Sequence, residues 1–208
     1  MGLSRQGIHG NYWKRVGNVV ARTVKGRVVL SIYQPNVSNP RTAKQTSQRN
    51  KFVAVIRAYN AFSIWAARWC KGWFPFGTGW SNFVKENFAH YQTQSGEVRW
   101  DRVTISRGSL LNPANPSAAI EAGVLTASWS DNSGQGNATS NDVVAICVYN
   151  SAKDVVVFND NAATRVDREG TINLPSAWNS DNVEVYLCCV SPDGSLRSNS
   201  LYLGSLSV

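Results

Sequence analysis

The chain has 208 residues, and its 43% apolar content supports a folded core, which excludes global disorder. The net charge of +8 is unevenly distributed along the sequence. Residues 1–110 contain 17 Lys and Arg against three Asp and Glu, a net charge of +14, whereas residues 111–208 contain four against ten, a net charge of −6. This division predicts a basic surface for an anionic partner, which could be nucleic acid, a membrane or the acidic half of another copy. The alternative is that the charge serves only to keep the protein in solution.

Several classes of protein are disfavoured by the sequence. It contains no run of about 18 apolar residues, so we expect no membrane span and no membrane partner. The start of the chain lacks the apolar region of a secretory signal, so we expect no export by that route. The four cysteines, Cys70, Cys147, Cys188 and Cys189, do not have the spacing of metal ligands, which indicates buried free thiols.

Residues 1–38 are predicted to form a basic, β-prone arm. Alternating valines indicate two short strands, 18–24 and 27–33, around a turn at residues 25–26. Val20, Arg22 and Val24 would share one face, and Val19, Ala21 and Thr23 the other. A lone two-stranded ribbon is marginal in water, so this arm should pack on the rest of the chain or on a neighbouring copy.

Two helices are predicted between residues 39 and 91. Asn39 and Pro40 suit the N-cap and the first turn of a helix that should run over residues 41–71. Its apolar residues recur at three- and four-residue steps; they are Phe52, Val55, Ile56, Tyr59, Phe62, Ala66 and Trp69. A second helix is expected over 80–91, capped by Ser81 or Thr78, followed by a strand over 98–107.

The Pro- and Asn-rich residues 111–119 are predicted to connect two domains, a basic ribbon-plus-helical region over 1–110 and an acidic region over 118–208. Short alternating runs then predict strands at 124–129, 143–149, 154–158, 164–174, 183–190 and 200–208. The predicted fold class is therefore α+β: an N-terminal β-ribbon and two helices followed by an antiparallel immunoglobulin- or fibronectin-III-like β-sandwich. Trp129 and Tyr186 are the expected core aromatics.

Signals for catalysis are weak. The two histidines, His9 and His90, have no Cys, Ser or Asp at motif spacing. Most acidic residues fall at predicted turns, where a solvated carboxylate is the usual outcome. Residues 131–138 resemble a calcium loop superficially but lack its alternating ligands. We therefore expect no catalytic residue, no cofactor, no metal ion and no small-molecule substrate.

Two groups of residues are candidates for binding. The first could contact phosphates or an acidic partner; it comprises Lys14, Arg15, Arg22, Lys25, Arg27, Arg41, Lys44, Arg49 and Lys51. The second is expected at an interface between copies; it comprises Trp13, Val20, Val29, Tyr33, Trp73 and Trp80. The tryptophans at 65–80 are more typical of a core or an interface than of a base-stacking platform.

Four segments follow one another along the chain: GNVVARTVKGRVVLS, NPRTAKQTSQRNKF, WSDNSGQGNATSNDVVAICVYN and SNSLYLGSLSV. In them the chain resembles a domain-of-unknown-function family of about this length from gut and environmental bacteria and their prophages. The segment from Asn39 to Phe52, with Gln45 and Arg49, is also similar to an opening helix of phage-associated proteins. The resemblance implies a phage or mobile-element setting and supplies no catalytic residue.

These observations predict a non-enzymatic structural protein of a phage-like particle, such as a capsid, head- or tail-associated subunit. It would form homo-oligomers, with the basic half of one copy on the acidic half of the next, in a virion or in the bacterial cytoplasm. The alternative is a sequence-nonspecific nucleic-acid-binding or packaging protein that uses the basic N-terminal half. A third hypothesis, suggested by the aromatic residues and the predicted sandwich, is a secreted-surface or carbohydrate-binding module. The missing export signal argues against it.

Overall fold

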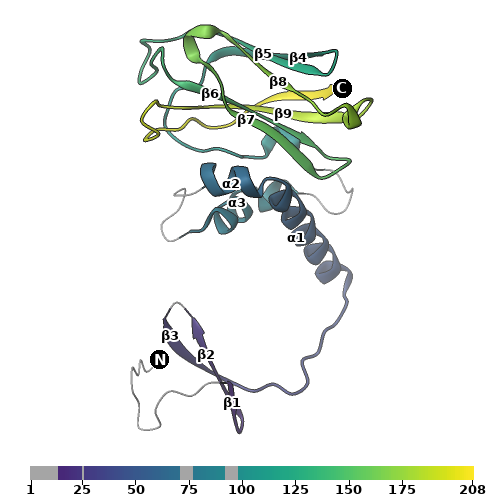
Figure 1. Ribbon diagram of the computed structural model, residues 1–208. Helices are drawn as coiled ribbons and strands as arrows, with labels where there is room; N and C mark the ends of the chain where they lie inside the picture. The colour runs from purple at the N-terminus through teal and green to yellow at the C-terminus, as the bar shows by residue number, and fades with distance from the viewer. Residues whose placement is uncertain (1–13, 25, 71–76, 92–97) are drawn as a thin grey trace. The chain divides into compact units, whose positions relative to one another are not determined.

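The computed structural model describes residues 14–24, 26–70, 77–91 and 98–208 (Figure 1). The chain divides into two compact units, Met1–Thr42 and Ala43–Val208. The described residues contain helices and three antiparallel sheets, which confirms the predicted α+β class. None of the described helices is long and apolar enough to span a membrane.

The first unit contains a three-stranded antiparallel sheet in the order β1-β2-β3. β2 (Val19–Val24) and β3 (Arg27–Ile32) are the two predicted strands, and β1 (Lys14–Val16) adds an unpredicted third that pairs with β2. Gly17 and Gly26 lie at the turns with φ angles of 58° and 75°, in the left-handed region where glycine carries no steric cost. β1 escaped prediction because three residues are too few to show alternation.

The second unit begins with the helices α1 (Ala43–Ala61), α2 (Ser63–Trp69) and α3 (Gly79–Asn87). The prediction of one helix over 41–71 is wrong in two respects: α1 begins three residues after Pro40, and the helix is interrupted at Phe62, where ψ is 6°. The predicted stop at residues 71–72 lies outside the described residues. Thr78 caps α3 as predicted: Ser81 N donates to Thr78 Oγ1 at 3.2 Å, and Thr78 N donates to Ser81 Oγ at 2.8 Å.

A short 3₁₀ turn replaces the end of the predicted second helix, and another lies where a strand was predicted. Instead of continuing to residue 91, α3 passes into the 3₁₀ turn η1 (Phe88–His90). The strand expected over 98–107 is wrong: this segment contains η2 (Trp100–Arg102), whose backbone bonds are local, including Val103 N to Trp100 O at 3.1 Å. Asp101 accepts two bonds from Arg99, two residues away, which favours this turn over an extended strand.

The strands of the second unit form two antiparallel sheets. The larger has the order β10 (Leu201–Ser207), β9 (Asn182–Val190), β6 (Val143–Asn150) and β7 (Val155–Thr164). The smaller has the order β4 (Ala114–Glu121), β5 (Val124–Ser130) and β8 (Glu169–Asn173). The 3₁₀ turns η3 (Arg165–Asp167) and η4 (Ser176–Trp178) flank β8, so the single strand predicted over 164–174 is too long.

β4 corrects the prediction that residues 111–119 are only a connector. It begins at Ala114 and pairs with β5, although it contains Pro116. Proline cannot donate to a β-ladder, but it is tolerated on an edge strand, and β4 is an edge strand of its sheet. The Pro-rich composition therefore marked a sheet edge rather than a domain boundary.

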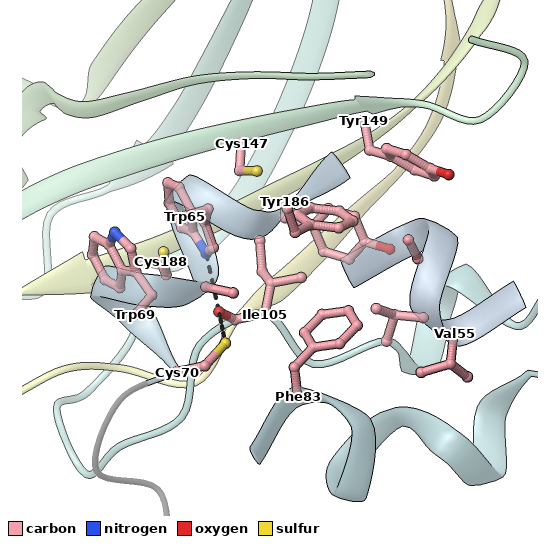
Figure 2. Packing of buried hydrophobic residues seen from close by; sticks show 14 of the residues in the cluster. Val55, Trp65, Trp69, Cys70, Phe83, Ile105, Cys147, Tyr149, Tyr186 and Cys188 are labelled. Carbon is pink, nitrogen blue, oxygen red and sulfur yellow. Dashed lines mark hydrogen bonds between the residues drawn. The ribbon is translucent and has the colours of Figure 1, made fainter. Parts of the chain in front are cut away.

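The larger sheet is buried on both faces. On one face, β6 contributes Val144, Ile146 and Val148 to a cluster that also contains residues of β5 and β8, with Trp129 buried as predicted. On the other face, Cys147 and Tyr149 of β6 and Tyr186 of β9 pack with side chains of α1, α2 and α3 (Figure 2). The nearly continuous apolar sequences of β6 and β9 are typical of strands covered on both sides.

This shared core explains where the chain divides. Val55, Phe62 and Trp65 of the helices are buried in the same cluster as Tyr149 and Tyr186 of the larger sheet. The chain therefore divides into its compact units between Thr42 and Ala43, whereas the sequence predicted the division after residue 110. The described helices α1, α2 and α3 supply the third layer of the second unit, over one face of its larger sheet.

Candidate functional site

The register of the three-stranded sheet separates its side chains into two faces of different character. Residues directly opposite each other in an antiparallel pair lie on the same face, and Val20 pairs with both Arg15 and Ser31. The basic face defined in this way comprises Arg15, Val20, Arg22, Val24, Arg27, Val29 and Ser31. The apolar face comprises Val16, Val19, Ala21, Val28, Leu30 and Ile32, together with Lys14 and Thr23.

Large side chains of the apolar face are exposed. The exposed fractions are 55% for Val16, 55% for Leu30 and 77% for Ile32, whereas Ala21 at the centre is 7% exposed. A small sheet needs a second layer to bury enough apolar area for stability, and no described residue of Met1–Thr42 outside the three strands is buried. The apolar face is therefore suited to contact with another molecule.

The basic face is partly ordered by local contacts. Arg15 Nε donates to Gly17 O at 2.9 Å, and the Arg15 guanidinium lies 3.6 Å from the centroid of the Tyr33 ring. Arg22 and Arg27 are exposed and form no ion pair with another described residue. Residues 1–42 contain seven Lys and Arg and no Asp or Glu, so this unit cannot neutralise its own charge.

The structure divides the predicted basic residues between the two units. Lys14, Arg15, Arg22 and Arg27 lie on the ribbon, and Arg41 lies in the exposed segment that follows it. The remaining described members lie on α1, in the second unit; they are Lys44, Arg49 and Lys51, the last with Nζ 4.7 Å from the Phe88 ring centroid. Lys25 lies outside the described residues.

The predicted interface residues are not those that form the apolar face. Val20 and Val29 lie on the basic face, and Tyr33 lies beside Arg15. Trp80 belongs to α3, where it is 40% exposed, with its ring 6.4 Å from that of Phe52. Trp13 and Trp73 lie outside the described residues.

Sequence reasoning missed Val16, Val19, Leu30 and Ile32. The length of the turn between β2 and β3 could have identified these four residues. A turn of two residues makes Val24 pair with Arg27, and this pair fixes the register of β3 on β2. With that register, the odd-numbered residues of β2 share a face with the even-numbered residues of β3. Val19 and Ala21 then align with Ile32 and Leu30.

The described residues offer little for chemistry. They contain no group of three or more His, Cys, Asp or Glu that could hold a metal ion. Burial raises the pKa of the Cys147 and Cys188 thiols well above the ordinary range, which disfavours the reactive thiolate. His90 lies in η1, and His9 lies outside the described residues. The exposed apolar face and the arginines opposite it make the three-stranded sheet the candidate functional site.

One protein-family model matches parts of both units of the chain. The model of a family of unknown function (DUF6266) matches residues 11–204, in agreement with the resemblance seen in the sequence. No curated protein matches the chain. A solved structure titled "Myokine structure" is similar at 16% identity and a TM-score of 0.29, over 48% of this chain and 92% of that chain.

Proposed function

We propose the following function for this chain, which belongs to a family of unknown function (DUF6266): it is a non-enzymatic structural protein that assembles with copies of itself. Assembly would use the apolar face of β1, β2 and β3. The exposed Val16, Leu30 and Ile32 carry this proposal, because they form a contiguous apolar surface on a sheet that has too little core of its own. The setting that we propose is the phage-like particle implied by the family resemblance.

A second copy of the ribbon is the partner that fits this face best. Two identical apolar faces are complementary to each other, and packing them together would give the layered pair of sheets that a small sheet needs. The opposite faces, with Arg15, Arg22 and Arg27, would then point away from each other. The reverse arrangement would bring like charges together in a unit that contains no carboxylate.

The test compares two matched pairs of substitutions in the full chain. Leu30→Thr with Ile32→Thr makes the apolar face polar and keeps strand propensity, so we expect the oligomer to dissociate or its midpoint concentration to rise at least about tenfold. Val20→Thr with Val29→Thr makes a similar change on the basic face and should leave assembly unchanged. Sedimentation velocity over a range of protein concentrations measures both.

Two outcomes would contradict this proposal. One is a parent protein that stays monomeric at every concentration; the other is a Leu30→Thr/Ile32→Thr variant that assembles like the parent. Salt separates this mode from contact between the basic and acidic parts of two copies, because screening weakens charge contacts but not apolar burial. An oligomer that dissociates as salt increases would favour the charge-based mode.

A second candidate function, sequence-nonspecific nucleic-acid binding, is favoured by the arginines of the basic face. Arg15, Arg22 and Arg27 share that face, with the Tyr33 ring beside Arg15. Guanidinium groups contact phosphates and aromatic rings stack on bases, so this face has both components of a nonspecific site. It stays available when the apolar face is covered, so the two proposed functions are compatible.

Nucleic-acid binding is tested with a short DNA duplex and a single-stranded RNA in fluorescence anisotropy titrations. The logarithm of the affinity should fall with the logarithm of salt concentration, by about 0.9 for each duplex phosphate contacted. Arg22→Gln with Arg27→Gln should weaken binding and flatten this dependence. Arg57→Gln with Arg102→Gln removes the same charge from exposed positions of the second unit and serves as the control. Strong preference for one sequence, or binding indifferent to salt, would contradict the proposal.

We also propose that β4–β10 form a fibronectin-III-like sandwich. Lettered in chain order as A, B, C, C′, E, F and G, the strands give one sheet in the order A-B-E and one in the order G-F-C-C′. Immunoglobulin-like sandwiches likewise place C, F and G on one sheet, with A, B and E on the other. An experimental structure in which the two sheets pack at about −30° would support this assignment, and orthogonal packing would exclude it.

A further inference from the structure

A cavity of about 460 Å³ lies between α1 and the larger sheet of the second unit. Its lining contains Ala54, Arg57 and Ala58 of α1, Tyr91 and Val98, Trp100 of η2, Tyr149 of β6, and Ser151 and Asp154 of the β6–β7 turn. The volume falls within the range of about 300–1,000 Å³ that is usual for small-molecule sites. Neither the proposed assembly nor the basic face uses this cavity.

Aromatic rings form a fixed wall of the cavity. The Trp100 ring packs 4.9 Å from that of Tyr149 and 6.1 Å from that of Tyr91, measured between centroids. Tyr186 Oη donates to Trp100 O at 2.9 Å, which holds the backbone of η2 against β9. Because Tyr91 and Tyr149 are buried and Trp100 is half-buried, the wall exists before any ligand arrives.

Polar groups surround the mouth of the cavity. Arg57, Ser151 and Asp154 are exposed, and the Arg57 guanidinium and Ser151 hydroxyl have no hydrogen-bond partner among the described residues. Asp154 Oδ1 accepts from Tyr149 Oη at 2.8 Å, which leaves Oδ2 for another donor. The mouth therefore offers unused donors and an unused acceptor together.

The turn that carries Ser151 and Asp154 is held in place by a buried side chain. Asn150 Oδ1 accepts from the backbone N–H groups of Ala152 and Lys153 at 3.0 and 3.1 Å. Asp154 has a φ of 54°, a left-handed conformation that Asp tolerates better than most residues. The polar groups of the mouth are thus positioned by the scaffold, as ligand-binding groups usually are.

This combination of groups favours an uncharged, hydroxyl-rich ligand. Arg57 and Asp154 carry opposite charges, so the mouth does not select a cation or an anion. Both are exposed, and exposed ion pairs contribute little, so a charged ligand gains little over a neutral one. A hydroxyl group both donates and accepts, and can therefore use the guanidinium and the carboxylate at once.

We propose that this cavity binds a neutral saccharide residue, with an apolar face of the sugar ring on the accessible part of Trp100 and its hydroxyls on Arg57 and Asp154. Trp100 supplies apolar contact area with little loss of side-chain entropy, because its ring is already packed against the buried rings of Tyr91 and Tyr149. The proposal concerns a bound ligand, not a substrate. It does not depend on the ribbon or on the oligomeric state.

The test uses the full chain and a panel of glucose, galactose, mannose and N-acetylglucosamine. Titration at concentrations on the order of 1–10 mM should shift the indole N–H resonance of Trp100 in ¹⁵N-correlated NMR spectra for at least one of them. Arg57→Ala should weaken that binding about threefold, because it removes hydrogen bonds from the ligand hydroxyls to an exposed side chain. Lys44→Ala, which removes a different basic side chain of α1, should leave the affinity unchanged.

A second variant fills the cavity and keeps its polar groups. Ala54→Phe should abolish the shift while the thermal unfolding transition stays cooperative, so loss of binding can be separated from loss of fold. The proposal is overturned if no saccharide of the panel shifts Trp100, or if Ala54→Phe binds like the parent. It is also overturned if phenylalanine or another zwitterionic amino acid shifts Trp100 when the saccharides do not.

Discussion

Arg165 and Asp142 form an enclosed ion pair in the second unit, with 2.9 Å between Arg165 Nη2 and Asp142 Oδ2 and no exposure of either side chain. Arg165 also donates to Asn132 Oδ1 at 2.6 Å and to Leu111 O at 2.7 Å. Asp142 Oδ2 accepts from the Thr139 N–H at 2.9 Å. The pair therefore ties η3 to the loop before β6 and to the segment that leads into β4.

Removal of one partner should leave the other charged, buried and unpaired. We expect Asp142→Ala to lower the free energy of unfolding by about 3–5 kcal/mol, measured by urea denaturation. Asp160→Ala, which breaks the exposed pair with Arg68, is the control and should change stability little. If both variants unfold at the same urea concentration as the parent, the enclosed pair does not have the structural role assigned to it.

Two buried tyrosines should respond in opposite directions to loss of their hydroxyls. Tyr91 is 1% exposed, and its hydroxyl has no hydrogen-bond partner among the described residues, whereas Tyr186 Oη donates to Trp100 O at 2.9 Å. An unsatisfied buried hydroxyl is unfavourable, so Tyr91→Phe should stabilise the protein by about 1 kcal/mol. Tyr186→Phe should destabilise it by about 0.5–1.5 kcal/mol.

Thermal and urea unfolding of the two tyrosine variants provide the measurement. Both substitutions remove one oxygen atom and keep the ring, so each is a control for the packing effect of the other. Equal destabilisation by the two would mean that Tyr91 has a hydrogen-bond partner in solution.

The second unit should depend on its helices for stability. The sequence alone predicted that residues 118–208 fold independently, but the larger sheet buries Cys147, Tyr149 and Tyr186 against α1–α3. We therefore expect the fragment 43–208 to unfold cooperatively, and the fragment 118–208 to be strongly destabilised and to bind a hydrophobic dye. A fragment 118–208 that melts cooperatively, within a few degrees of the longer one, would restore the prediction made from sequence.

The sequence predicted the strands well where alternation or strong turn residues marked them. β5, β6, β9 and β10 lie within two residues of their predicted bounds, because glycine, proline and Asn/Asp turns delimit them. The strand over 98–107 failed because local pairs such as Arg99 with Asp101 favoured a 3₁₀ turn. The break at Phe62 escaped because an apolar stripe continues in phase across it.

The domain boundary and the apolar face required information that periodicity does not contain. The composition of residues 111–119 is typical of a connector. Composition does not show that residues 114–119 pair with β5, because that pairing joins residues on opposite sides of a turn. The unbroken apolar sequence of β6, VVAICVYN, was the available sign that a third layer covers the sheet. Likewise, the opposite characters of the ribbon faces follow from the register of β2 on β3, not from either strand alone.

Stability should decrease at alkaline pH because of the buried thiols. Burial raises the pKa of Cys147 and Cys188 well above the ordinary range and that of Cys189 to about 12. In the unfolded chain these groups ionise near pH 8.5, so above that pH the unfolded state loses protons that the native state retains. The free energy of unfolding should therefore be constant between about pH 7 and 8 and fall as the pH rises toward 10.

Urea denaturation at several pH values measures this fall, and a thiol reagent such as DTNB supplies an independent check. All four cysteines are free and buried, so they should react slowly in the native protein and completely once it is unfolded. Cys188→Ala should reduce the loss of stability between about pH 8.5 and 10, since it removes one of the groups whose protonation differs between the states. Rapid labelling of the native protein would show that the thiols are accessible and that the core around Tyr186 is not closed. A free energy of unfolding that rises between about pH 8.5 and 10 would likewise contradict the burial of these thiols.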